Sequence, residues 1–203
     1  MRINSYLSKQ FAAPTGPGGS VISFIMNRQN RPLYDETIKR LPLECSDNVL
    51  DIGCGNGFVL NLLARRQNAT FVGIDPSESI LEAASRRNRK FVRGGQMHFA
   101  CHDVNMMSFP GDTFTKAYTI NTVYFWDDLE KAMAEIRRVL KPGGLFINTL
   151  YTNETLSRFS HTRFGYRRYD VQQLERVGSE AGFGVQTVPV LQGEALCLLY
   201  QKT

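Results

Sequence analysis

Cysteine and histidine are scarce in this chain, and no apolar run is long enough to span a bilayer. The four cysteines, Cys45, Cys54, Cys101 and Cys197, are widely spaced and form no CxxC pair, which disfavours a disulfide framework and a zinc site. Residues 1–11 show no apolar leader segment. We therefore expect a protein that holds no metal, has no membrane attachment and is located in the cytoplasm.

Charge of either sign is also modest. The 203 residues carry a formal net charge of +5, with 21% charged and 42% hydrophobic residues. This composition suits one globular domain with a real core. A mild positive charge permits an anionic partner but does not require one, so nucleic acid is not the favoured partner.

Strand-like and helix-like segments alternate from residue 48 onward. The loop 191–194 is too short for a crossover, so the two strands that it joins must be antiparallel. Asp127 and Glu130 have the spacing of a capping box at the start of one helix. We predict strands at 49–52, 70–74, 97–101, 116–121, 145–151, 183–190 and 195–201, and helices at 58–66, 77–90, 128–140 and 170–181.

This order predicts an α/β fold that is Rossmann-like, with helices on both faces of a mostly parallel seven-stranded sheet and a C-terminal antiparallel strand. We treat residues 1–203 as a single domain with its core in residues 47–203.

Residues 1–41 precede the first predicted strand. They comprise a Gly- and Pro-rich loop at 12–20 and short helices at 21–27 and 33–41, the second with Pro32 at its start. Their apolar content predicts that they pack against the core, as a helical cap over the strand ends with Gly16, Gly18 and Gly19 as hinges. The alternative is that they brace the edge of the sheet.

The most informative stretch is the loop Asp51-x-Gly53-x-Gly55-x-Gly57, which leaves a predicted strand and enters a predicted helix. Glycines allow a tight turn and let a ligand approach bare backbone. The N–H groups of the helix start favour an electron-rich ligand group. Asp75, at the end of the next strand, can accept hydrogen bonds from both hydroxyls of a ribose.

Three interpretations of this loop are open. It can be a plain turn, or a nicotinamide dinucleotide site, or a site for a nucleoside without a pyrophosphate. The dinucleotide pattern G-x-G-x-x-G/A needs a small residue where this chain has Phe58. A nucleoside site needs only the three glycines and the preceding acid, Asp51.

The loop resembles the first motif of class I S-adenosylmethionine-dependent methyltransferases, and within them the small enzymes of the ubiquinone and menaquinone biosynthesis type. Three further segments resemble other motifs of this family, namely Val72–Ser77, Cys101–Val104 and Lys141–Gly144. The resemblance covers about residues 47–150, and Phe183–Gln201 is similar to the terminal hairpin of the family.

The resemblance implies S-adenosylmethionine as the cofactor and assigns a role to individual residues. The glycines line its methionine part, Asp51 orients its ammonium, and Asp75 holds its ribose. The cofactor-binding residues implied in this way are Asp51, Gly53, Cys54, Gly55, Gly57, Asp75, Pro76, Ser77, Asp103, Val104 and Asn121.

Asn121, Tyr124 and Trp126 follow the fourth strand, where open α/β sheets bind ligands, and are the catalytic candidates. The aromatic pair can equally be packing for the next helix. We expect methyl transfer to a small-molecule acceptor by in-line displacement, from a monomer or homodimer. The alternatives are an RNA or protein methyltransferase and a cofactor-binding regulatory protein without transferase activity. Binding of RNA would suit the segment in which Arg163, Arg167 and Arg168 are interleaved with aromatic residues.

Overall fold

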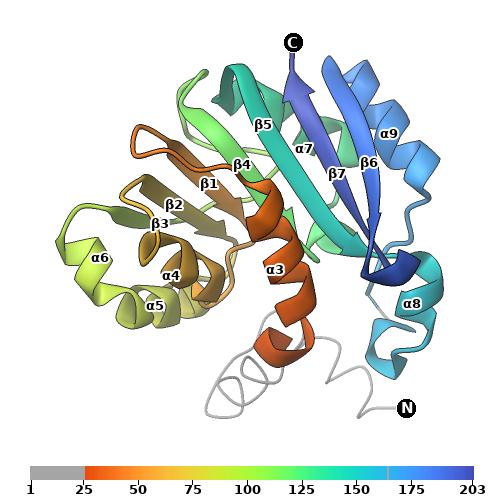
Figure 1. The fold of residues 1–203 in the computed structure, drawn as a ribbon, viewed down its shortest axis with the longest axis horizontal. Coiled ribbons are helices and arrows are strands. Elements are labelled where there is room, and N and C mark those ends of the chain that lie inside the picture. Colours follow the sequence, from red (N-terminus) through yellow and green to blue (C-terminus); the bar gives the residue numbers. More distant parts are fainter. Residues whose placement is uncertain (1–25, 164) are drawn as a thin grey trace.

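The computed structural model describes residues 26–163 and 165–203, except for the His161 side chain. A seven-stranded sheet with the order β3-β2-β1-β4-β5-β7-β6 forms its centre (Figure 1). The strands are β1 (Asn48–Ile52), β2 (Thr70–Asp75), β3 (Met97–Cys101), β4 (Phe114–Ile120), β5 (Leu140–Tyr151), β6 (Phe183–Val190) and β7 (Ala195–Lys202).

The strand directions agree with the predicted sheet. Neighbouring strands from β3 to β5 are all parallel, whereas β7 runs antiparallel to both β5 and β6. The predicted Rossmann-like α/β fold with one reversed C-terminal strand is therefore confirmed.

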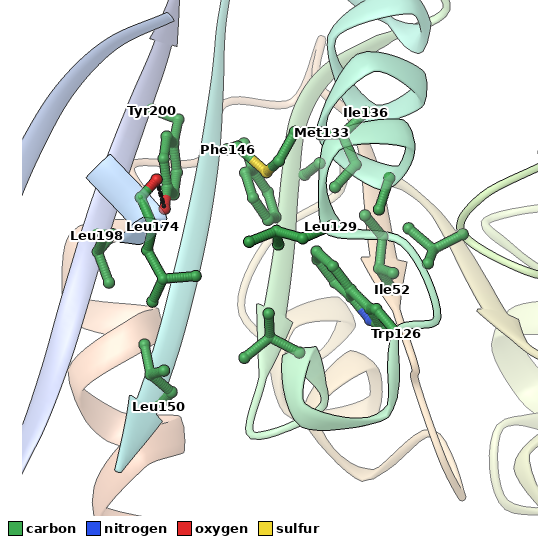
Figure 2. Close-up of a cluster of buried hydrophobic side chains, with 14 of the residues drawn as sticks. Ile52, Trp126, Leu129, Met133, Ile136, Phe146, Leu150, Leu174, Leu198 and Tyr200 are labelled. Carbon is green, nitrogen blue, oxygen red and sulfur yellow. Dashed lines mark hydrogen bonds between the residues drawn. The ribbon is translucent and has the colours of Figure 1, made fainter. Parts of the chain in front are cut away.

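Helices cover both faces of the sheet, as predicted. They are α3 (Arg31–Arg40), α4 (Phe58–Ala64), α5 (Glu78–Arg87), α6 (Arg89–Arg93), α7 (Leu129–Val139), α8 (Asn153–Ser157) and α9 (Val171–Glu180). Helices α3 and α4 pack in one apolar cluster with Val49 and Phe71, and α7 and α9 pack in another with Phe146 and Tyr200. Figure 2 shows part of the second cluster. No helix in the described part of the chain is long and apolar enough to cross a membrane.

The prediction of one continuous helix over 77–90 is wrong, because the helix is interrupted at Asn88, between α5 and α6. Asn88 has φ −103° and ψ 16°, outside helical geometry. Its buried side-chain amide donates to the carbonyl oxygens of Gly57 and Ala84, each at 3.0 Å. These hydrogen bonds hold Asn88 in its non-helical conformation, so α5 ends there and α6 begins as a separate helix.

Several other boundaries differ from the predictions by a few residues, and two of these differences have a clear local cause. Asp128, not Asp127, caps α7, and its Oδ1 accepts a hydrogen bond from the Lys131 backbone N–H at 2.9 Å. Strand β5 begins at Leu140, because Leu140 already pairs with Phe114 and residues 141–144 form an irregularity within the strand. Neither difference moves the strand ends that face the site.

Only part of the prediction for residues 1–41 falls on residues that the structure describes. The predicted loop 12–20, with its glycines, and most of the predicted helix 21–27 lie outside the described residues, whereas residues 26–29 are helical and lead into α3. Pro32 lies in the first turn of α3, as predicted. The Thr37 hydroxyl lies 2.7 Å from the Thr149 hydroxyl of β5 and joins the helix to the sheet. The single-domain organisation stays a prediction.

Candidate functional site

A cavity of about 370 Å³ lies at the carboxyl ends of β1, β2 and β4. Strand β1 pairs with β2 on one side and β4 on the other, so the order of strands reverses beside it. Open α/β sheets bind ligands at this point, because the loops from neighbouring strands leave toward opposite faces. The predicted site residues that line the cavity are Asp51, Gly53, Cys54, Gly55, Asp75, Pro76, Asp103, Val104, Asn121 and Trp126.

The glycine loop is tied to the neighbouring strand by its backbone. The N–H groups of Gly53 and Cys54 both donate to the Ile74 carbonyl, at 2.8 and 2.9 Å. Gly55 has φ +51°, and a Cβ atom added there would meet no atom within 4 Å. Its backbone is therefore open to the cavity, whereas a Cβ atom on Gly57 would lie 2.6 Å from the Asn88 amide nitrogen.

Asn88 is a positioning residue that the sequence reasoning did not find. It is 1% exposed, and besides holding the Gly57 carbonyl it accepts a hydrogen bond from the Asn61 amide at 2.8 Å. It therefore links the end of the glycine loop to both α4 and α5. A lone asparagine within a basic run carries no sequence signal for this role.

Asp75 connects the end of β2 to the glycine loop. Its Oδ2 accepts from the Gly55 N–H at 3.2 Å, and its Oδ1 accepts from the Ser77 N–H at 3.0 Å. Burial raises the pKa of this carboxyl, and the two backbone hydrogen bonds oppose that rise. Each carboxylate oxygen keeps a further lone pair for a ligand hydroxyl.

Asp51 is the most deeply buried acid of the site, at 4% exposure. Burial raises its pKa to about 7, despite the hydrogen bond from the Tyr118 hydroxyl, and the nearby charge of Asp75 adds to the rise. The Tyr118 oxygen lies 2.7 Å from Oδ2 of Asp51. A cationic ligand group beside Asp51 would favour its ionised form.

The electrostatic character of the cavity is acidic. Its described lining contains three carboxylates, Asp51, Asp75 and Asp103, and one histidine, His102, but no lysine or arginine. Such a lining favours a ligand with positive charge and offers no counter-ion for a pyrophosphate. Among the described residues, no three His, Cys, Asp or Glu side chains are grouped so that they could hold a metal ion.

Residues from the N-terminal region complete the cavity. Met26, Asn27, Asn30 and Tyr34 contribute to its lining. The Tyr34 hydroxyl donates to Asn27 at 3.2 Å, and the Asn27 amide donates to Asn56 of the glycine loop at 3.4 Å. The sequence predicted a cover here but not its residues, because their contacts depend on packing between distant segments.

Asn121 follows β4 and has an unusual backbone. Its φ is +62°, in the left-handed region that only a minority of non-glycine residues adopt. Its backbone N–H donates to the Thr149 carbonyl at 2.8 Å, and its side-chain amide donates to Asn30 at 3.3 Å. Its Oδ1 is buried without a hydrogen-bond partner.

Three predicted residues do not line the cavity, namely Gly57, Ser77 and Tyr124. Gly57 and Ser77 border it through the contacts described above. Tyr124 is 1% exposed, and its hydroxyl donates to the Tyr151 carbonyl at 2.9 Å, so the structure does not bring it to the site. Trp126 lines the cavity and also packs with Ile52 and Leu129 in the core cluster (Figure 2).

Known proteins that are similar to this chain are methyltransferases. Residues 49–144 match the family model of the methyltransferase domain. The uncharacterised methyltransferase YdaC of Bacillus subtilis is 29% identical over 135 residues, which are 66% of this chain and 72% of YdaC. Sterol 24-C-methyltransferase of Eremothecium gossypii is 32% identical over 152 residues, 74% of this chain and 40% of that protein.

A solved structure supports the same fold. Geranyl diphosphate C-methyltransferase of Streptomyces coelicolor, in complex with Mg²⁺, geranyl diphosphate and S-adenosylhomocysteine, superposes with a TM-score of 0.73 at 14% identity. The match covers 95% of this chain and 87% of the other. The narrower resemblance to quinone-biosynthesis enzymes stays a prediction. The domain match and these methyltransferase relatives support a class I S-adenosylmethionine-dependent methyltransferase.

Proposed function

We propose that the chain binds S-adenosylmethionine in the 370 Å³ cavity and transfers its methyl group to a small-molecule acceptor. The observation that carries this proposal is the acidic lining, with three carboxylates and neither lysine nor arginine among the described residues. The cofactor has a sulfonium and an ammonium, and both suit such a lining. The pyrophosphate of NAD would face carboxylates there instead of cations.

The residues of the cavity fit the parts of the cofactor. Asp75 would accept from the ribose hydroxyls, because its oxygens project beside the open backbone of Gly55. Asp51 would pair with the ammonium. Asp103 and Val104 would border the adenine with Pro76 and Ser77.

When bound, the cofactor supplies an electrophilic methyl group. Alignment of the acceptor with that group and exclusion of water then provide much of the rate. Asn121 and Trp126, at the end of β4, are the residues that would surround the reacting atoms. Four residues of the segment 26–34 line the cavity, and this segment would help to exclude water from it. This placement supports the predicted cover.

A small acceptor is favoured over RNA because two of the three arginines of the interleaved basic segment, Arg167 and Arg168, have internal partners. Arg167 donates to Asp127, and Arg168 donates to the Thr162 carbonyl at 3.2 Å. Two relatives named above act on a sterol and on geranyl diphosphate by their names, and both are small molecules. A cofactor-binding protein without turnover remains the alternative from another class.

Removal of the Asp75 carboxylate should weaken cofactor binding. Hydrogen bonds to a charged group contribute about 1.5–3 kcal/mol each, so Asp75→Ala should lose about tenfold or more in affinity for S-adenosylmethionine. Calorimetric titration measures this loss. The matched control is Glu78→Ala, which removes an exposed carboxylate close by in the sequence and should bind normally. Equal affinity in both folded variants would rule out Asp75 as the ribose ligand.

Cofactor affinity should depend on pH through Asp51. Because burial raises its pKa to about 7, the carboxyl is mostly protonated at pH 6 and mostly ionised at pH 7.5. Only the ionised form attracts the cofactor ammonium, so the affinity should rise over this range. Tyr118→Phe removes a hydrogen bond to the ionised form and should move the rise to higher pH.

The control for this dependence is Asp51→Asn, which cannot ionise. It should bind more weakly at pH 7.5 and show no rise between pH 6 and 7.5. If Asp51→Asn keeps the full pH dependence of the unmodified protein, Asp51 is not the group that titrates.

The class of acceptor can be determined with cofactor that carries a labelled methyl group. The protein is incubated with this cofactor and fractionated cell extract, and we expect label in small metabolites. An Asp75→Ala sample serves as the background control. Label found only in RNA or only in protein would contradict a small-molecule acceptor, and label nowhere would favour the regulatory alternative.

A further inference from the structure

A second cavity, of about 120 Å³, adjoins the first. The two share Met26, Asn30 and Asn121 in their linings. Beyond these three residues, the second cavity is lined by Gln29, Tyr151, Leu156, Phe159, Thr162 and Tyr166. It therefore lies beyond the end of β4 and is bordered by the segment that follows β5.

The lining of this second cavity has no charge. Among the described residues it contains no Asp, Glu, Lys, Arg or His side chain. A carboxylate or phosphate on the ligand would find no counter-ion there, and burial of an unpaired charge is strongly unfavourable. The ligand of this cavity is therefore uncharged when it enters.

The described side chains of the lining also include no general base. Burial raises the pKa of Tyr151, and it raises the pKa of Tyr166 to about 12, so both phenols stay protonated near neutral pH. Thr162 is not a base at this pH. An acceptor that must lose a proton before it reacts, such as an alcohol, would have no group in the lining to take it.

Three hydrogen-bond donors of the lining have partners within the protein. The Tyr151 hydroxyl donates to the Gln29 carbonyl at 3.2 Å, and the Thr162 hydroxyl to the Phe159 carbonyl at 2.9 Å. The Asn121 amide donates to Asn30 at 3.3 Å, whereas Oδ1 of Asn121 has no partner. Oδ1 of Asn121 is therefore a buried acceptor at this cavity that still needs a donor.

We propose that the second cavity holds the methyl acceptor and that this acceptor is a small, uncharged primary or secondary amine. This inference rests on the proposed function. The ligand N–H donates to Oδ1 of Asn121, which reaches it when the side chain turns about its terminal bond and releases the long contact to Asn30. The left-handed backbone of Asn121 holds this residue at the junction of the two cavities.

The reaction balances without a protein base. The nitrogen lone pair forms the new bond to the methyl carbon while the carbon–sulfur bond breaks and its electron pair stays on sulfur. The product leaves as an ammonium ion, which carries the positive charge that the sulfonium loses and exchanges its proton with water after release. A thiol is only a weak hydrogen-bond donor toward Oδ1 of Asn121, and an alcohol needs a base to react, so neither suits this lining as well as an amine does.

A matched panel of acceptors tests this inference. Propyl, isobutyl and cyclopentyl skeletons are each offered as amine, alcohol, thiol and carboxylate, and S-adenosylhomocysteine formation is measured. We expect methylation of amines, at a rate that rises with pH as the fraction of neutral amine rises. Calorimetry with S-adenosylmethionine is run first, because absence of cofactor binding would overturn the proposed function itself.

Variants of the second cavity separate the acceptor from the cofactor. Phe159→Trp narrows the cavity and should raise KM for the amine about tenfold, with cofactor Kd within about threefold of normal. Ser157→Trp adds the same ring at an exposed position of α8 and should change neither. Asn121→Asp, which keeps an acceptor oxygen, should retain more amine methylation than Asn121→Ala.

Some results would overturn the inference while the proposed function stands. They are cofactor binding with methylation of thiols or alcohols but not amines, cofactor binding with no methylation of any amine in the panel, or an unchanged KM in a folded Phe159→Trp variant. A methylation rate that does not rise with pH in proportion to the fraction of neutral amine would also overturn it.

Discussion

The reversal of strand order at β1 is the constraint on which the rest of the site depends. Because β1 lies between β2 and β4, all three parallel strands end at one edge while the loops that follow diverge. This divergence opens the cavity and brings Asp51, Asp75 and Asn121 to it from three separate strands. Hydrogen bonds from the glycine loop to Ile74 and Asp75 then fix the loop that the ligand meets.

The electrostatics of this cavity would favour a cationic ligand. Burial of Asp51 and Asp75 raises the pKa of both carboxyls. A nearby cation would stabilise the ionised form of either one. The described residues that line the adjoining cavity carry no charge. The acidic cavity would therefore suit a cationic methyl donor, and the uncharged one would suit a neutral methyl acceptor. Asn121 belongs to both and is where the two meet.

The sequence could predict what local patterns encode. The alternation of strands and helices, the glycine loop and the acid at the end of β2 are local, and the structure places them as expected in the fold. Asn30, Asn88 and Tyr118 could not be predicted, because each acts through a contact with a residue far away in the chain. The aromatic residues after β4 were ambiguous for another reason. They lie outside regular helix and strand, so no sequence periodicity indicates which ring faces the cavity.

The central claim is that the acidic cavity binds a cationic nucleoside and not a dinucleotide. Isothermal titration of the purified protein with S-adenosylmethionine and, separately, with NAD tests it most directly. We expect micromolar binding of S-adenosylmethionine, on the order of −8 kcal/mol, with little or no binding of NAD. Binding of NAD with no binding of S-adenosylmethionine would contradict the account.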